Sequence, residues 1–223
     1  MKFILLFVVI VLALLILPFV FLPEKSKTVP PSNEGNPWQV EKLPENLSRV
    51  FGIDVGRATL SQVRARLGND IEVAMLVAPG ERGSVEAYYS DFKAGMVNGK
   101  LVLNIRTTLE EREAMLARAQ KAEYMKGTTR RITLDPADLL RLEAYIVSAA
   151  TFIPSAQLDE EIILQRFGKP SERIRSNENT EHFLYPEIGL DLQLNNKGKE
   201  VLQYVPPRDF ATLREPLLQA GTP

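Results

Sequence analysis

The first residues constrain this chain most, because every side chain at positions 3–22 is apolar. At 1.5 Å rise per residue, a helix of this length spans about 30 Å, the thickness of the hydrocarbon core of a bilayer. Pro18 lies near the end of the run, where it leaves most helical hydrogen bonds intact. Residues 1–23 are therefore predicted to form a transmembrane signal anchor.

A cleaved secretory signal peptide is the alternative interpretation of this run. Such a peptide has an apolar region of about 7–15 residues, followed by a cleavage site with small side chains. Here the run is longer and ends on the bulky pair Phe21 and Leu22, and the chain has no cysteine to carry a lipid. The sequence favours an uncleaved anchor, and cleavage stays open as the alternative.

The lysines flanking the run do not decide its orientation, since Lys2 precedes it and Lys25 and Lys27 follow it. Long folded domains cross the membrane largely regardless of their charge. We therefore expect the amino terminus inside and the domain outside the cytoplasm.

Residues 24–38 are rich in proline and poor in apolar side chains. Proline-rich segments extend by about 3.1 Å per residue, so this tether could reach roughly 45 Å from the membrane. Trp38 ends it and is expected to pack on the domain, with an interfacial or recognition role as the alternative.

The chain carries 27 basic and 28 acidic residues, and the two signs alternate along most segments. Nucleic-acid-binding domains usually have a clustered basic face. Nucleic acid is therefore not an expected partner.

The segment at residues 59–68 is echoed one hundred positions later, at 159–168. Thr59 and Asp159 are good N-cap residues, and Gln62 completes a capping box in the first copy. Gly68 and Gly168 supply the residue that ends a helix. Each copy is therefore predicted to begin with a short helix.

β-prone runs follow each predicted helix. The expected strands are 71–78, 84–92 and 100–107 in the first copy, and 171–177, 181–194 and 199–205 in the second. Asn98-Gly99 and Lys197-Gly198 are predicted to form the turns before the last strand of each copy. Alternation of leucine with polar residues at 190–195 predicts one buried face, which helices must cover.

Three further helices are expected. Helices at 45–51 and 136–150 would precede the two copies, and a helix at 109–126, capped by Thr108 and Glu111, would connect them. The predicted fold class is α+β, with an N-terminal transmembrane helix followed by two helix-helix-three-strand repeats with antiparallel sheets. The predicted organisation is an anchor at 1–23, a tether at 24–38, a first repeat plus connecting helix at 39–127, a second repeat at 128–208 and a C-terminal tail at 209–223.

The second copy contains Arg166-Phe167-Gly168-Lys169-Pro170 and then Tyr185-Pro186-Glu187-Ile188-Gly189-Leu190. This pattern resembles the envelope lipoproteins of the BamE/SmpA type, and two units in tandem are similar to the arrangement in β-lactamase-inhibitor protein. The first copy keeps only the helix and a looser Tyr89-Ser90-Asp91-Phe92.

The resemblance implies two-helix, three-stranded units that contact proteins in the bacterial envelope without catalysis. Together with the anchor predicted at 1–23, it leads us to expect a single-pass protein of the inner (cytoplasmic) membrane, with its C-terminal domain in the periplasm and another envelope protein as partner. Family members are typically lipid-anchored through a cysteine, whereas this chain has none and is expected to use a spanning helix.

The sequence contains no pattern that identifies an active site. His182 is the single histidine, and it follows Glu181 on a predicted strand, where neighbours point to opposite faces. The acidic run 159–161 starts a helix and is explained by capping, and a zinc site needs more histidine or cysteine ligands. No serine lies in a nucleophile elbow.

Gly52 and Gly56 near Arg57 also lack the pattern of a phosphate-binding loop. The sequence therefore predicts no catalytic, cofactor-binding or metal-binding residue and no cofactor, and the protein is expected not to be an enzyme.

Two functions remain open. One is a membrane-anchored protein-interaction or scaffold module, with Tyr88, Tyr89 and Tyr185 as interface candidates unless they only pack in the core. The other is an extracytoplasmic enzyme that acts on envelope material through an unrecognised active site. His182, a carboxylate and a serine around one pocket would favour the enzyme, and their separation would count against it.

Overall fold

The computed structural model describes residues 35–125 and 127–220, all of which belong to one compact unit, Asn33–Pro223. In this part of the chain, no helix has both the length and the apolar character needed to cross a membrane. The span predicted at 1–23 and most of the tether predicted at 24–38 lie outside the described residues.

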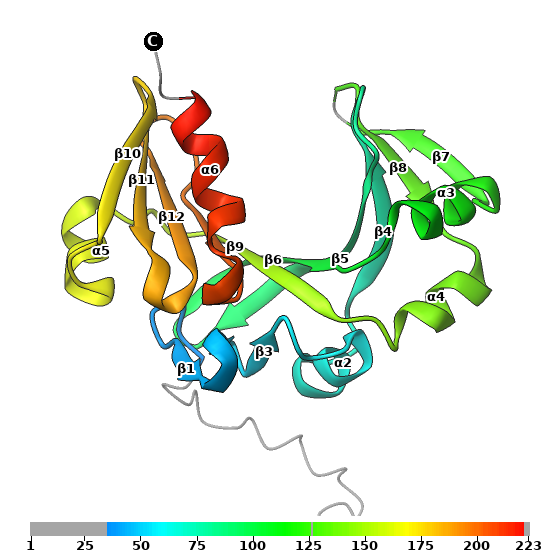
Figure 1. Cartoon of the computed structure of the whole chain (residues 1–223), viewed down its shortest axis with the longest axis horizontal. Helices are drawn as coiled ribbons and strands as arrows, with labels where there is room; N and C mark the ends of the chain where they lie inside the picture. Colours follow the sequence, from blue (N-terminus) through cyan, green and yellow to red (C-terminus); the bar gives the residue numbers. More distant parts are fainter. Residues whose placement is uncertain (1–34, 126, 221–223) are drawn as a thin grey trace, which may run out of the picture. The chain divides into compact units, whose positions relative to one another are not determined.

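A ten-stranded antiparallel sheet dominates the unit (Figure 1). Its strands, in spatial order, are β10 (Glu172–Asn177), β11 (Thr180–Tyr185), β12 (Leu190–Asn195), β13 (Val201–Tyr204), β9 (Val147–Pro154), β6 (Val97–Ile105), β5 (Ser84–Ala94), β4 (Glu72–Val77), β8 (Arg130–Thr133) and β7 (Lys121–Tyr124). A second antiparallel sheet has three strands, β1 (Glu41–Leu43), β2 (Leu47–Val50) and β3 (Ile53–Val55).

The described α-helices are short. They are α2 (Leu60–Leu67), α3 (Leu109–Ala117), α4 (Pro136–Leu142), α5 (Glu160–Phe167) and α6 (Ala211–Ala220). Single 3-10 turns, η1 (Pro44–Asn46), η2 (Pro186–Ile188) and η3 (Pro207–Asp209), separate some of the strands.

The predicted fold class of two helix-helix-three-strand repeats is therefore wrong, because the unit is mostly β and strands from both predicted repeats belong to the same ten-stranded sheet. β9 joins the two halves, pairing with β6 on one side and β13 on the other. The helix expected at 136–150 ends at Leu142 as α4, and residues 147–150 belong to β9. The β-branched residues of β9 pack between two strands, and this sheet pairing outweighs local helix propensity.

The two other expected helices also differ from the structure. Residues 45–51 form η1 and β2, and the chain then reverses at Phe51 and Gly52, both with positive φ (55° and 76°), as a two-residue hairpin turn requires. The helix expected at 109–126 is α3 and stops at Ala117. Its remainder contains β7, which pairs with β8 at the edge of the large sheet.

One turn prediction is wrong, and one predicted strand is divided at the bend expected at Tyr185-Pro186. Gly99 lies inside β6, where it pairs with Phe92 and Pro154, and the chain reverses at Gly95 and Met96 instead. The strand expected at 181–194 is interrupted by η2 and becomes β11 and β12.

The echo between the copies is confirmed at its two helices. The side chain of Thr59 caps α2 by accepting from the Gln62 N–H. The side chain of Gln62 in turn accepts from the Thr59 N–H, which completes a capping box. Asp159 caps α5 by accepting from the Ile162 N–H at 2.8 Å. Both helices end at a glycine with positive φ, Gly68 and Gly168.

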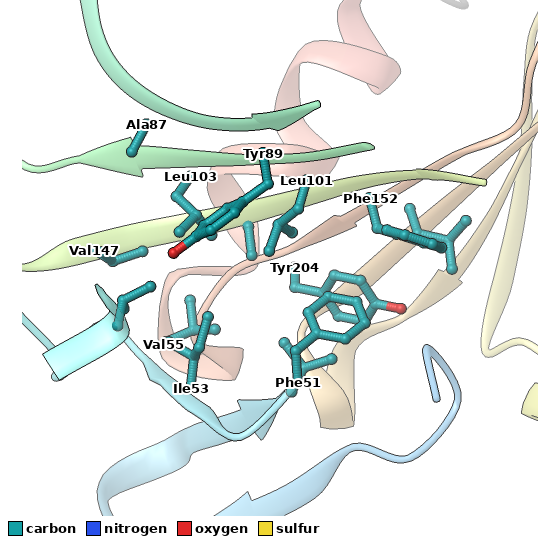
Figure 2. Packing of buried hydrophobic residues seen from close by; sticks show 14 of the residues in the cluster. Phe51, Ile53, Val55, Ala87, Tyr89, Leu101, Leu103, Val147, Phe152 and Tyr204 are labelled. Carbon is teal, nitrogen blue, oxygen red and sulfur yellow. The ribbon is translucent and has the colours of Figure 1, made fainter. Parts of the chain in front are cut away.

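The main core lies between the large sheet, the three-stranded sheet and the helices α2 to α5. Phe51 belongs to this core and lies beside Tyr204 in Figure 2. Its ring centre is 5.4–5.6 Å from those of Phe92, Phe152 and Tyr204. A phenylalanine with positive φ is strained. These aromatic contacts hold it in place and tie the hairpin β2–β3 to the sheet.

The opposite face of the large sheet is called the open face here. It carries the residues that alternate with the buried ones, such as Tyr88 on β5, Val102 on β6 and Thr151 on β9, all of them half-buried. Of the described helices, α6 is the one that lies on this face (Figure 1). Much of the open face is therefore not covered by a helix.

Candidate functional site

A row of direct cross-strand partners crosses the open face from β11 to β4. The row consists of Leu184, Asp191, Gln203, Thr151, Val102, Tyr88 and Glu72. Paired residues in an antiparallel sheet point to the same side. Seven strands from both halves of the chain therefore contribute to one surface.

Helix α6 covers one end of this surface. Leu213 and Leu217 pack with Phe210 against Leu184 and Val205, in a cluster separate from the main core. Arg214 on α6 also donates to both carboxylate oxygens of Glu172 on β10, at 2.7 and 3.2 Å. The helix was not expected from the sequence, which placed these residues in the tail at 209–223.

Two shallow pockets occupy the part of the open face beyond α6. One has a volume of about 420 Å³ and is lined by Glu72, Ala74, Leu76, Glu86, Tyr88, Lys100, Val102, Met125, Arg131 and Ile153. The other, also of about 420 Å³, lies beside α6 and is lined by Asn104, Ser148, Ala149, Thr151, Gln203, Val205, Asp209, Thr212 and Leu213. Val102, which lines the first pocket, is the direct partner of Thr151, which lines the second, so the two pockets lie next to each other over the middle of the sheet and are called the hollow here.

The lining of this hollow is mixed in character. Tyr88 and Val102 form an apolar centre, and Met125, at the end of the β7–β8 hairpin, leaves 47% of its surface exposed. Charges are balanced around this centre, because Arg131 pairs with Glu72 at 2.6 Å and the other two charged lining residues, Lys100 and Glu86, are of opposite sign. An aromatic and aliphatic centre with a polar surround is typical of protein-binding surfaces.

The three tyrosines singled out from the sequence have different positions. Tyr88 lies on the open face, whereas Tyr89 and Tyr185 are buried on the core side. The hydroxyls of Tyr89 and Tyr185 donate to the carbonyls of Gly68 and Gly168, both at 3.0 Å, so each tyrosine ties a strand to the end of its preceding helix. Burial raises the pKa of Tyr185 to about 12, and the neutral phenol is kept as a donor.

His182 has partners that the sequence did not reveal. Its Nδ1 lies 2.9 and 3.0 Å from the two carboxylate oxygens of Asp191, and its Nε2 lies 3.2 Å from the hydroxyl of Ser176. As predicted, Glu181 does not cooperate with it and instead accepts two hydrogen bonds from Arg173. The structure thus joins the histidine, a carboxylate and a serine.

These partners were missed because they come from neighbouring strands. Ile174 and His182 are direct partners across the β10–β11 hairpin, and Ser176 lies two residues further along β10. Only the register of the hairpin and of β11 with β12 brings the three side chains together. The alternation of β10 and the turn at residues 178–179 were the signals that could have suggested the first of these pairings.

The remaining sequence candidates have structural roles. Arg57 forms ion pairs with Glu45 at 3.5 Å and Asp54 at 3.9 Å. Glu160 accepts from Arg173 at 2.7 Å, a bond that lowers the pKa of the Glu160 carboxyl. Across residues 35–125 and 127–220, no group of three or more histidine, cysteine or acidic residues is arranged to hold a metal ion.

Trp38 packs on the domain, as expected. Its ring meets Phe167 edge-on at 6.4 Å, and the Arg166 guanidinium lies 4.8 Å from the ring centre. Both contacts are with α5, so the end of the tether is attached to the second copy.

Comparisons with models of known families, with curated proteins and with solved structures found no match. The resemblance to BamE/SmpA-type lipoproteins therefore stays a prediction.

Proposed function

We propose that this protein is a single-pass, membrane-anchored module of the bacterial cell envelope whose extracytoplasmic domain binds another envelope protein. The membrane location rests on the uninterrupted apolar sequence at residues 3–22. The binding role rests on the open face of the large sheet.

The observation that carries the binding role is the hollow beyond α6. A sheet face in the interior of a protein is covered by a helix or a second sheet. Here the same face is covered by α6 at one end and is half-exposed at Tyr88, Val102 and Thr151. A partner that packed on this part of the face would continue the layer that α6 begins.

The composition of the hollow favours a protein partner. Tyrosine and methionine are enriched at protein interfaces, and Tyr88 and Met125 both line the hollow. The ion pair of Arg131 with Glu72 and the nearby Lys100 leave no strong excess of either charge. A highly charged ligand therefore fits this surface less well than a protein surface of mixed polarity.

Site-specific photo-crosslinking in cells tests this proposal. A photoreactive residue placed at position 88 or 151, on the open face, should give the same discrete cross-linked product. The matched controls are positions 65 and 165, which are exposed on α2 and α5, on the other side of the sheet. Products that are absent at 88 and 151, or equally strong at 65 and 165, would contradict binding at the open face.

A second variant separates loss of binding from loss of folding. Val102→Arg places a charge at the centre of the hollow and should remove the products from both open-face positions, whereas Ala65→Arg on α2 should not. The membrane topology is tested independently by a reporter fused after Pro223. A reporter active in the cytoplasm would refute the extracytoplasmic location.

A further inference from the structure

Three polar side chains from adjacent strands form a hydrogen-bonded chain near one end of the open face. Asp191 is on β12, His182 on β11 and Ser176 on β10. The carboxylate lies 2.9 Å from Nδ1 of the histidine, and the serine Oγ lies 3.2 Å from Nε2. The order is that of an orienting carboxylate, a general base and a nucleophile.

The burial of the three residues changes in the same order. Asp191 and His182 leave 2% and 6% of their surfaces exposed, whereas Ser176 is half-buried. In the neutral imidazole, a hydrogen bond that Nδ1 donates to the Asp191 carboxylate places the proton on Nδ1 and leaves a lone pair on Nε2. This lone pair can accept the Ser176 proton, so the buried residues His182 and Asp191 can activate the more accessible serine.

The backbone at Ser176 is also irregular. Arg175 and Asn177 pair with Glu181 and Thr180 on β11, but Ser176 has no partner there, because the register shifts by one residue at this point. Such a β-bulge changes the direction of a side chain, and bulges are frequent next to active sites. β10 is an edge strand, so a substrate can approach the serine from beyond the sheet.

We propose that Ser176, His182 and Asp191 form a nucleophilic centre that hydrolyses carboxylic esters. The Ser176 oxygen bonds to the carbonyl carbon while its proton passes to Nε2 of His182, and Asp191 stabilises the imidazolium through Nδ1–H. The bond to the alkoxy group then breaks, and the alcohol leaves with the proton from Nε2. Water attacks the acyl-serine with His182 as base, releasing the acid and restoring the serine.

This activity is separate from the proposed binding role. Ser176 and His182 lie on the β10–β11 hairpin, whereas the hollow is lined by residues of β4, β5, β6, β8, β9, β13 and α6 and of adjoining loops. The sequence predicts no catalytic residue, because the pairing of β10, β11 and β12 that joins these three side chains is not visible in it.

A biotinylated alkyl fluorophosphonate tests the nucleophile directly. A phosphorus–oxygen bond forms at an activated serine as fluoride leaves. The detergent-solubilised full chain should be labelled at Ser176, as located by peptide mass spectrometry, and the urea-denatured chain should not. Ser176→Ala should abolish this label, whereas Ser155→Ala, at an exposed serine after β9, should retain it.

Asp191→Asn tests whether the serine is activated by the histidine. The amide keeps a hydrogen bond to His182 but reverses its tautomer, so labelling and p-nitrophenyl acetate hydrolysis should slow by at least about 100-fold. Trp38 fluorescence and circular dichroism show whether each variant is folded. A folded wild-type chain without label at Ser176, or an unchanged rate in folded Asp191→Asn, overturns the proposal and leaves the three residues with a structural role only.

Discussion

Gly189→Ala should destabilise the domain strongly, because both the backbone conformation at this position and the close approach of Val205 require a glycine. Its φ of 71° and ψ of 29° lie in the left-handed region, which costs a residue with a Cβ about 1–2 kcal/mol. A Cβ at this position would also lie 1.9 Å from the backbone carbonyl oxygen of Val205. The Val205 N–H in turn donates to the Gly189 carbonyl at 2.9 Å, so neither segment can move without losing that bond.

The steric part of the penalty can be bounded from known overpacking. Forcing extra atoms into a packed site costs about 1–3 kcal/mol, so the total loss in the free energy of unfolding should be about 2–5 kcal/mol. Gly80→Ala is the matched control, because Gly80 has a φ of 78° and nothing within 4 Å of the Cβ position. It should lose only the conformational part, about 1–2 kcal/mol.

Urea unfolding of the full chain in detergent, followed by circular dichroism and by the fluorescence of Trp38, measures both losses. Trp38 is the only tryptophan, and it packs on Phe167. If Gly189→Ala and Gly80→Ala lowered stability equally, the close approach to Val205 would have no energetic weight, and the reasoning would be refuted.

Two further predictions concern the tyrosines and the helix caps. Burial raises the pKa of Tyr185 to about 12 and raises those of Tyr89 and Tyr204, so their contribution to stability is complete below about pH 10 and is lost as the pH rises above it. At pH values above 10, the urea concentration at the unfolding midpoint should therefore decrease, and the tyrosinate absorbance of the buried tyrosines at 295 nm should appear as the domain unfolds. Titration of all six tyrosines near pH 10 in a folded domain would contradict this. Thr59→Ala and Asp159→Ala should each lower the free energy of unfolding in urea by about 1 kcal/mol, because each removes a side-chain acceptor from the start of a helix. Gln165→Ala, on the exposed surface of α5, is the control, and losses no greater than its own would count against these caps.

Local features were predicted well where short-range chemistry decides them. The N-caps Thr59 and Asp159, the terminal glycines of α2 and α5 and the capping box at Thr108 all formed as expected. These signals work because the interacting groups are at most four residues apart.

The errors lie where distant strands decide the outcome. Residues 147–150 and 121–124 were placed in helices, but pairing with β6 and β8 makes them strands. The helix α6 was missed because Pro216 lies inside it and its apolar residues only gain a partner when Leu184 and Val205 are brought beneath them. Tertiary packing outweighed propensity in each case.

The Tyr-Pro-x-x-Gly-Leu pattern can be recognised in the sequence, but the reason for its residues cannot. Its residues were apparent in the sequence as a resemblance. Their roles became apparent only in the structure, where Tyr185 bonds to Gly168, Pro186 begins η2 and Gly189 approaches Val205.

The amino-acid sequence by itself determined the apolar run at 3–22, the helix caps and the alternation of the strands, because each depends on neighbouring residues along the chain. The tertiary structure alone decided that β9 joins the halves into one sheet, that part of the open face stays uncovered and that Ser176, His182 and Asp191 meet. Strand pairing depends on register, and register is settled by long-range packing that no local pattern contains.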